Sequence, residues 1–318
     1  MNKYLINALL VITLVNLISG CKEEVVSPPS SDWPIINGEY LGQTPPGNTP
    51  VVFAPGIIST ENNEAILAAY SGGNELYYLV VQSDNNNITS TILETKVENE
   101  RWTKPQVVSF SGVYMDGYQA IHPDGSRIYF QSNRPIDTSE SKYEWNIWYA
   151  ERVGNSWSDP KSIGKPINGI NHTSGPSVTS NGTIYFTIMT IGGASNIYRS
   201  EFLNGQYQTS EKLPNKINKG IQQFDSYIAP DESYLIYCGY GRVNSFGSTD
   251  LYISFRNNNG DWSDEINLGP AINTTEAEGS ATITADGKYI FYGRYNEDES
   301  KGIDIYWFSS EFIESLRP

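Results

Sequence analysis

The chain has 318 residues, which is compatible with one large domain or two of ordinary size. Aromatic residues make up 13 %, with 22 Tyr and 7 Trp, and this composition favours short strands and tight turns over helices. The 21 basic against 36 acidic residues give a net charge of −15. Phosphate backbones would repel such a surface, so we expect no nucleic-acid partner.

The first twenty residues predict a cleaved export signal. Lys3 is followed by an apolar run over residues 5–18, which is too short for a comfortable membrane span and ends in small residues. The sequence Ile18-Ser19-Gly20-Cys21 resembles the bacterial lipobox. That resemblance implies a diacylated Cys21 at the mature N-terminus and anchoring to the membrane through the lipid. The alternative is an ordinary signal peptide with an incidental cysteine.

The segment after the signal predicts a membrane tether and a cellular location. Lys22-Glu23-Glu24 resembles the short signal of lipoproteins exposed on the outer face of the outer membrane, with a periplasmic location as the alternative. Proline, serine and glycine are frequent up to about residue 48, so we divide the chain into a signal (1–20), a membrane tether (21–48) and a body (49–318). The second cysteine, Cys238, lies in an apolar run and is expected in the core.

The body contains an internal repeat. Apolar runs joined by an Asp-Gly or Asn-Gly turn, or by a variant of it, predict hairpins at 69–78, 121–130, 178–186, 228–237 and 283–292. Third strands are expected at 146–149, 196–199, 250–253 and 304–307. Trp-containing turns at 101–105, 156–160 and 261–264 lead into short outer strands, and Tyr207 replaces the Trp in one copy.

Four strands in each 50 to 57 residues predict the blades of an all-β propeller. The repeats resemble the WD40-like, TolB-type propeller lipoprotein family, from about Pro50 to the C-terminus. We count five four-stranded antiparallel blades. The last repeat lacks its outer strand and residues 50–58 resemble one, so we expect the N-terminal strand to complete the last blade and close the ring.

This fold predicts where polar side chains gather. The start of each inner strand and the loop between the second and third strands should lie on one face, at the mouth of the central channel. The strand starts supply the candidate catalytic carboxylates Glu64, Asp116 and Glu278, with Asp225 close by; the candidate ligand-binding residues are Arg134, His172, Arg242 and Arg294. The competing interpretation is that these residues form structural ion pairs.

Other chemistry is not expected from the sequence. With only His122 and His172 in the chain, we predict no metal site, and His122 is expected to cap its hairpin turn. Phosphate-binding and dinucleotide-binding motifs are absent from the sequence, so we expect no cofactor.

Two functions compete. The first is an envelope lipoprotein, expected as a monomer, whose propeller binds a protein, peptide or glycan at the channel face. The alternative is a carbohydrate-active enzyme, a glycoside hydrolase or polysaccharide lyase, that uses the carboxylates at the channel mouth. No diagnostic motif supports either kind of enzyme.

Overall fold

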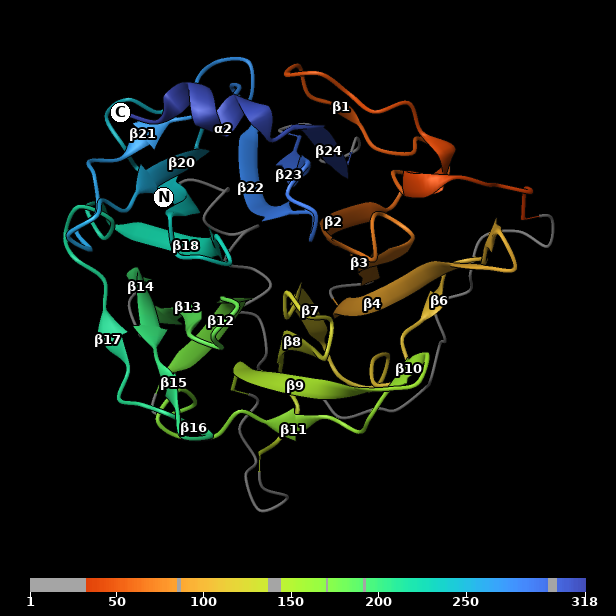
Figure 1. Ribbon diagram of the computed structural model, residues 1–318, viewed down its shortest axis with the longest axis horizontal. Coiled ribbons are helices and arrows are strands. Elements are labelled where there is room, and N and C mark those ends of the chain that lie inside the picture. Colours follow the sequence, from red (N-terminus) through yellow and green to blue (C-terminus); the bar gives the residue numbers. More distant parts are fainter. Residues whose placement is uncertain (1–32, 85–86, 137–143, 170, 191–192, 297–301) are drawn as a thin grey trace.

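The computed structural model describes residues 33–84, 87–136, 144–169, 171–190, 193–296 and 302–318. They form an all-β propeller, in which antiparallel groups of strands surround a common centre (Figure 1). Each group is named here after its innermost strand. Among the described residues, no helix is long and apolar enough to cross a membrane.

The strand groups follow one another along the chain. The β2 group contains β2 (Asn63–Tyr70), β3 (Glu75–Asp84), β4 (Asn87–Glu98), β5 (Arg101–Trp102) and β6 (Gln106–Val107). The β7 group contains β7 (Asp116–Ile121), β8 (Arg127–Ser132), β9 (Asn146–Val153), β10 (Ser156–Trp157) and β11 (Lys161–Ser162). The β12 group contains β12 (His172–Val178), β13 (Ile184–Met189), β14 (Ser195–Ser200) and β17 (Glu211–Lys212), with a side hairpin of β15 (Phe202–Leu203) and β16 (Gln206–Tyr207).

The remaining groups complete the ring. The β18 group contains β18 (Gln222–Ile228), β19 (Tyr234–Tyr240), β20 (Thr249–Phe255) and β21 (Ile266–Asn267). The β22 group contains β22 (Ala277–Ile283), β23 (Tyr289–Tyr295), β24 (Ile303–Ser309) and β1 (Val51–Val52). A short 3-10 helix, η1 (Glu39–Gly42), precedes β1, and α2 (Glu311–Leu316) follows β24. The innermost strands contact one another in the order β2, β7, β12, β18, β22 and back to β2.

The N-terminal strand closes the ring as predicted. Val51 and Val52 of β1 pair antiparallel with Trp307 and Tyr306 of β24. The next residue, Phe53, is fully buried, and its amide donates a hydrogen bond to the carbonyl of Ile305 at 2.8 Å. This pairing covers the edge of β24 that would otherwise be open.

The segment before β1 differs from the expected tether. Trp33 donates a hydrogen bond from its indole Nε1 to the carbonyl of Trp102 at 3.1 Å, and Tyr40 and Leu41 are each only 2 % exposed. Burying these side chains removes apolar surface from water, so residues 33–48 lie on the propeller instead of extending from it. The signal and Cys21 lie outside the described residues.

The hairpin turns explain how the repeat folds locally. In three of them the Asp carboxylate accepts a hydrogen bond from the amide two residues on: Asp124 from Ser126, Asp231 from Ser233, and Asp286 from Lys288. This side-chain turn stabilises the reversal between the inner strand and the second strand. Cys238 of β19 is fully buried in the core, as expected.

Candidate functional site

Two of the predicted carboxylates form ion pairs inside their own strand groups. Arg134 donates from Nη2 to Oδ1 of Asp116 at 2.7 Å, and Arg294 donates from Nε to Oε1 of Glu278 at 2.9 Å. Both carboxyl groups are completely buried. Burial raises the pKa of Asp116 and of Glu278, and the arginines oppose that shift. Each pair ties the start of an inner strand to the end of the second strand or the residues just after it, since Arg294 lies in β23 and Arg134 follows β8.

Glu64 has the same position in its strand but binds no arginine. Its two carboxylate oxygens accept hydrogen bonds from the Thr60 amide at 3.0 Å and the Thr60 hydroxyl at 2.6 Å. Thr274 contacts Glu278 in the same way, at 2.9 and 2.7 Å. Glu64 is 2 % exposed, and burial raises its pKa. Glu64 and Glu278 therefore hold the loops that precede their inner strands.

The remaining predicted residues at this face are also engaged. The start of β18 carries Gln223, and Arg242 pairs instead with Glu265, Nε to Oε2 at 3.1 Å. His172 accepts a hydrogen bond at Nδ1 from the amide of Trp145 at 3.1 Å. The predicted residues at the strand starts and loops therefore serve separate groups and do not form one cluster.

The inner strands share a distortion that brings other residues together. Each strand contains a β-bulge where one residue adopts a positive φ angle: Ile66 (50°), Tyr118 (53°), Gly175 (55°), Asp225 (48°) and Ser280 (55°). A positive φ is unfavourable for residues other than glycine, above all for a β-branched one such as Ile66. Since the strain recurs in every inner strand, we attribute it to the fold, which turns one residue of each strand toward the centre.

Contacts show that these five residues converge. The Ser280 hydroxyl donates to Oδ2 of Asp225 at 2.8 Å. A Cβ atom added at Gly175 would lie 3.2 Å from Oδ1 of Asp225, so this glycine leaves room for the carboxylate. Tyr118 interacts electrostatically with Asp225 and packs against the cluster that contains Ile66. Asp225 is thus the one acidic member of this central set.

The surroundings of Asp225 change its acidity. Its carboxyl group is 9 % exposed, and burial raises its pKa to about 7, although the hydrogen bond from Ser280 opposes the shift. Tyr118 and Tyr295 are half-buried, and burial together with the charge of Asp225 raises the pKa of both phenols. At neutral pH the centre therefore offers a partly protonated carboxylic acid beside neutral phenols, which suits proton transfer.

Of the predicted site residues, Asp225 alone lies in this central set. The sequence analysis did not name Tyr118, Ser280 or Tyr295. A signal was present: Ile66, Tyr118, Gly175, Asp225 and Ser280 each follow the aligned strand-start position by two residues. Counting two residues on from each aligned position would have found the set.

The described residues contain no group of three or more His, Cys, Asp or Glu side chains arranged to hold a metal ion. The thiol of Cys238 accepts a hydrogen bond from the amide of Ser280 at 3.3 Å, and burial raises its pKa, so it is a poor nucleophile.

Comparisons with known proteins identify the fold. No protein-family model and no curated protein matches the chain. Solved structures that match include a complex of BT0996 with RGII, with a TM-score of 0.53 and 12 % identity over 86 % of this protein and 92 % of that one. Others are the native Bacillus subtilis arabinanase Arb43A (TM-score 0.51, 11 % identity, 78 % and 95 % covered) and a glycoside hydrolase (TM-score 0.50, 11 % identity, 86 % and 92 % covered).

These matches correct our first functional expectation. A propeller that only binds a protein, peptide or glycan was the main interpretation of the sequence, and this interpretation is wrong: structures that share the fold over most of both chains carry the names of glycan-cleaving enzymes. They favour the alternative, a carbohydrate-active enzyme. At 11 to 12 % identity the likeness shows the fold alone, so the activity of this chain has to be argued from its own residues.

Proposed function

We propose that this protein is a carbohydrate-active enzyme that hydrolyses glycosidic bonds at the centre of a five-bladed propeller. The observation that carries the proposal is Asp225, a buried carboxyl group with a pKa of about 7 at the point where the inner strands converge. The glycan-cleaving enzymes among its structural neighbours support the same class of reaction.

Asp225 supplies the acid that such a reaction needs. Protonated Asp225 donates its proton to the glycosidic oxygen while the bond from that oxygen to the anomeric carbon breaks. The carboxylate formed in this step then accepts a proton from the water that adds to the anomeric carbon. Asp225 therefore ends the reaction protonated, as it began. In this proposal Tyr118 and Tyr295, neutral phenols that interact electrostatically with Asp225, donate hydrogen bonds to substrate oxygens.

The usual two-carboxylate scheme would require a second free acid. Asp116 and Glu278 are paired with arginines, and Glu64 with Thr60. None of these three contacts Asp225 in the structure, which is why the proposal assigns both proton transfers to Asp225.

Hydrolysis is favoured over the lyase reaction. A lyase acting on uronates would need a cation for the substrate carboxylate, and the candidates for that role were Arg134, Arg242 and Arg294. All three bind carboxylates of this chain at 2.7 to 3.1 Å.

The proposal also includes the cellular location of the enzyme. We infer that Cys21 carries the lipid and that the propeller stands at the outer membrane, where a glycan-cleaving enzyme meets extracellular polymers. The lipobox-like Ile18-Ser19-Gly20-Cys21 and the acidic residues after it support this location.

The test is an assay for new reducing ends. The purified protein is incubated with a panel of plant, algal and bacterial polysaccharides, and Asp225→Asn is compared with the wild type. We expect a loss of activity of about 10²-fold or more in this variant and a decline in the wild-type rate as the pH rises through about 7, because the acid loses its proton. Asp286→Asn, in the turn between β22 and β23, is the control. Unchanged activity of Asp225→Asn, or no product from any polymer, would refute the proposal.

A further inference from the structure

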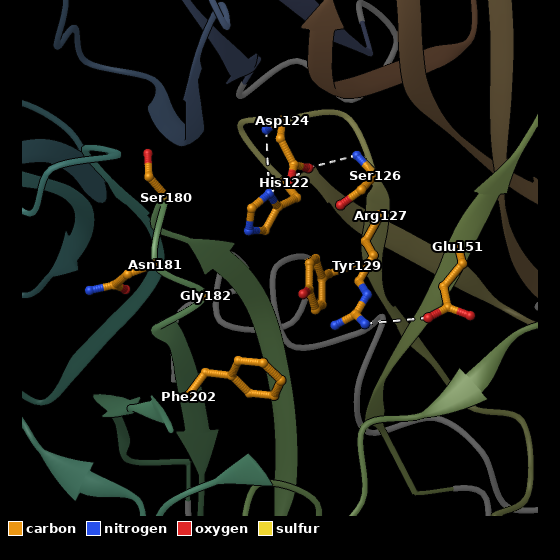
Figure 2. A pocket seen from close by; sticks show the side chains of 10 residues that line it. All are labelled: His122, Asp124, Ser126, Arg127, Tyr129, Glu151, Ser180, Asn181, Gly182 and Phe202. Atoms are coloured by element: carbon orange, nitrogen blue, oxygen red, sulfur yellow. Dashed lines mark hydrogen bonds and ion pairs between the residues drawn. The ribbon is translucent and has the colours of Figure 1, made fainter. Parts of the chain in front are cut away.

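A pocket lies far from the strand starts. It occupies about 360 Å³ between the hairpin turns of the β7 and β12 groups, at the opposite ends of the inner strands (Figure 2). Its lining residues are His122, Asp124, Ser126, Arg127, Tyr129, Glu151, Ser180, Asn181, Gly182 and Phe202. This volume lies within the range of small-molecule sites in proteins.

Elsewhere in the ring, an ion pair closes one boundary between neighbouring groups. Between the β2 and β7 groups, Arg152 donates from Nη1 to Oε1 of Glu75 at 2.9 Å, and its guanidinium lies 4.3 Å from the centre of the Trp157 ring. The Trp157 indole donates in turn to the hydroxyl of Tyr77 at 3.0 Å. The arginine thus fills this boundary together with the two aromatic rings.

The boundary between the β12 and β18 groups is bridged by a hydrogen bond from Tyr185 of the first group to Glu232 of the second, and Glu232 also pairs with Arg256 of its own group. Arg256 donates from Nη1 to Oε2 of Glu232 at 2.8 Å, and the hydroxyl of Tyr185 donates to the same carboxylate at 2.7 Å. Trp262 lies below this arginine, with its ring centre 5.7 Å from the guanidinium carbon.

The boundary that holds the pocket has different residues at the same repeat positions. Phe202 takes the place of Arg152, Tyr207 that of Trp157, and Arg127 that of Glu75. No ion pair can form between a phenylalanine and an arginine. Arg127 instead contacts Glu151 of its own group at 3.3 Å, and Phe202 packs on Tyr207 with ring centres 4.8 Å apart. The pocket therefore opens at the repeat positions that hold the Arg152–Glu75 ion pair at the boundary between the β2 and β7 groups.

The lining has the chemistry of a sugar site. Figure 2 shows the rings of Phe202 and His122 on two sides of the open centre, with the Arg127–Glu151 pair on a third. The apolar ring offers a surface for the C–H face of a sugar. The guanidinium can donate to hydroxyl groups and the carboxylate can accept from them, which suits groups that do both.

The pocket contains both positive and negative side chains, which disfavours a strongly charged ligand of either sign. An anion would face the carboxylates of Glu151 and Asp124, and a cation would face Arg127. The second positive charge nearby, Lys161, is held by Glu151 at 2.6 Å. His122 lies at the same turn as Asp124, and its Nδ1 accepts a hydrogen bond from the Asp124 amide at 3.3 Å.

We propose that this pocket binds one residue of a neutral glycan, as a second and non-catalytic site on the face opposite the strand starts. That its ligand is a polymer chain rests on the proposed function. An enzyme that holds a polymer at a second point keeps the chain at a high effective concentration near Asp225, so the site should raise the apparent affinity for polymers and not for short substrates.

The experiment is affinity gel electrophoresis of the protein carrying Asp225→Asn, which keeps the polymer uncleaved. Arabinan, galactomannan and xyloglucan serve as neutral polymers, and polygalacturonate as an acidic one. We expect a neutral polymer to slow migration, and Phe202→Ala in the same background to raise its apparent Kd about tenfold, the upper end of what one aromatic contact contributes. Leu203→Ala is the matched control, because Leu203 lies in the same hairpin, is 50 % exposed and does not line the pocket.

The outcomes separate the two proposals. If Phe202→Ala migrates like the Leu203→Ala control with every neutral polymer, or if only polygalacturonate slows the protein, the pocket proposal is refuted even when Asp225 proves catalytic. If the wild type releases no reducing ends but retardation depends on Phe202, the hydrolase proposal falls and the glycan site stands. Unfolding curves for both variants check that the fold is retained.

Discussion

Replacing Asp225 by Asn should stabilise the protein above neutral pH. The pKa of Asp225 is about 7 in the folded protein, against an ordinary value of 3.8, because burial disfavours the charged form. The folded state therefore binds the proton more tightly than the unfolded state. The stability that this one group contributes is fully present below about pH 4, is lost as the pH rises from about 4 to about 7, and stays absent above that.

The magnitude follows from the size of the shift. A difference of roughly three pKa units corresponds to about 4 kcal/mol of unfolding free energy at pH 8. An asparagine carries no charge, and its carbonyl oxygen can still accept the hydrogen bond from Ser280. We therefore expect Asp225→Asn to unfold with nearly the wild-type free energy at pH 4 and to be more stable by up to about 4 kcal/mol at pH 8.

The assay is urea unfolding of both proteins at several pH values between 4 and 8, followed by tryptophan fluorescence. Asp286→Asn provides a control of opposite sign: burial raises the pKa of Asp286, but hydrogen bonds from Thr284 and Lys288 outweigh it and lower the pKa overall. Relative to the wild type, that control should be less stable throughout this range, and an added measurement at pH 3 should show a smaller difference. A free-energy difference between wild type and Asp225→Asn that stays constant from pH 4 to 8 would refute the reasoning.

Three further predictions concern the fold and the anchor. Arg134→Met should lower the free energy of unfolding by about 3 to 5 kcal/mol, because it leaves Asp116 buried without its partner. The double variant with Asp116→Leu should recover most of this loss. A loss below about 1 kcal/mol in the single variant would contradict the prediction. Deleting residues 22–58 should produce oligomers in size-exclusion chromatography, since the edge of β24 is then open; a monomeric deletion variant would show that β1 is dispensable. Cys21→Ser should move the protein from the membrane fraction to the soluble fraction, and unchanged fractionation would remove the case for a lipid.

The sequence predicted the fold well where local chemistry decides it. The hairpins follow from Asp-Gly turns between apolar runs, and the Asp carboxylates make the expected turn contacts, as Asp124 does with Ser126. The last repeat lacks an outer strand, and the N-terminal strand that resembles it pairs with β24 as predicted. The tether was predicted too long, because composition alone does not show that Tyr40 and Leu41 fill a gap in the core.

The candidate site was predicted less completely, because side-chain partners depend on long-range contacts. The sequence names arginines and carboxylates for this face, but whether Arg134 faces a ligand or Asp116 depends on a distance that sequence does not give. Asp225 was named among the carboxylates only because it lies near an aligned position. Its neighbours Ser280 and Tyr118 come from other groups, 55 and 107 residues away in the sequence, and only the closed ring brings them together.

The bulges explain why one acid can differ so much from the others. All inner strands bear the same strained backbone, so the strain belongs to the ring and does not identify a site by itself. What varies is the side chain at the bulge. Ile66 fills space and Gly175 leaves it open, whereas Asp225 places a carboxylate among buried groups without an arginine beside it. The acids that brace the loops have partners within their own groups, and Asp225 accepts a single hydroxyl hydrogen bond from a neighbouring group. An unpaired charge at this depth lowers stability at neutral pH. The proposed role of Asp225 as the catalytic acid would explain why a carboxyl group stands there.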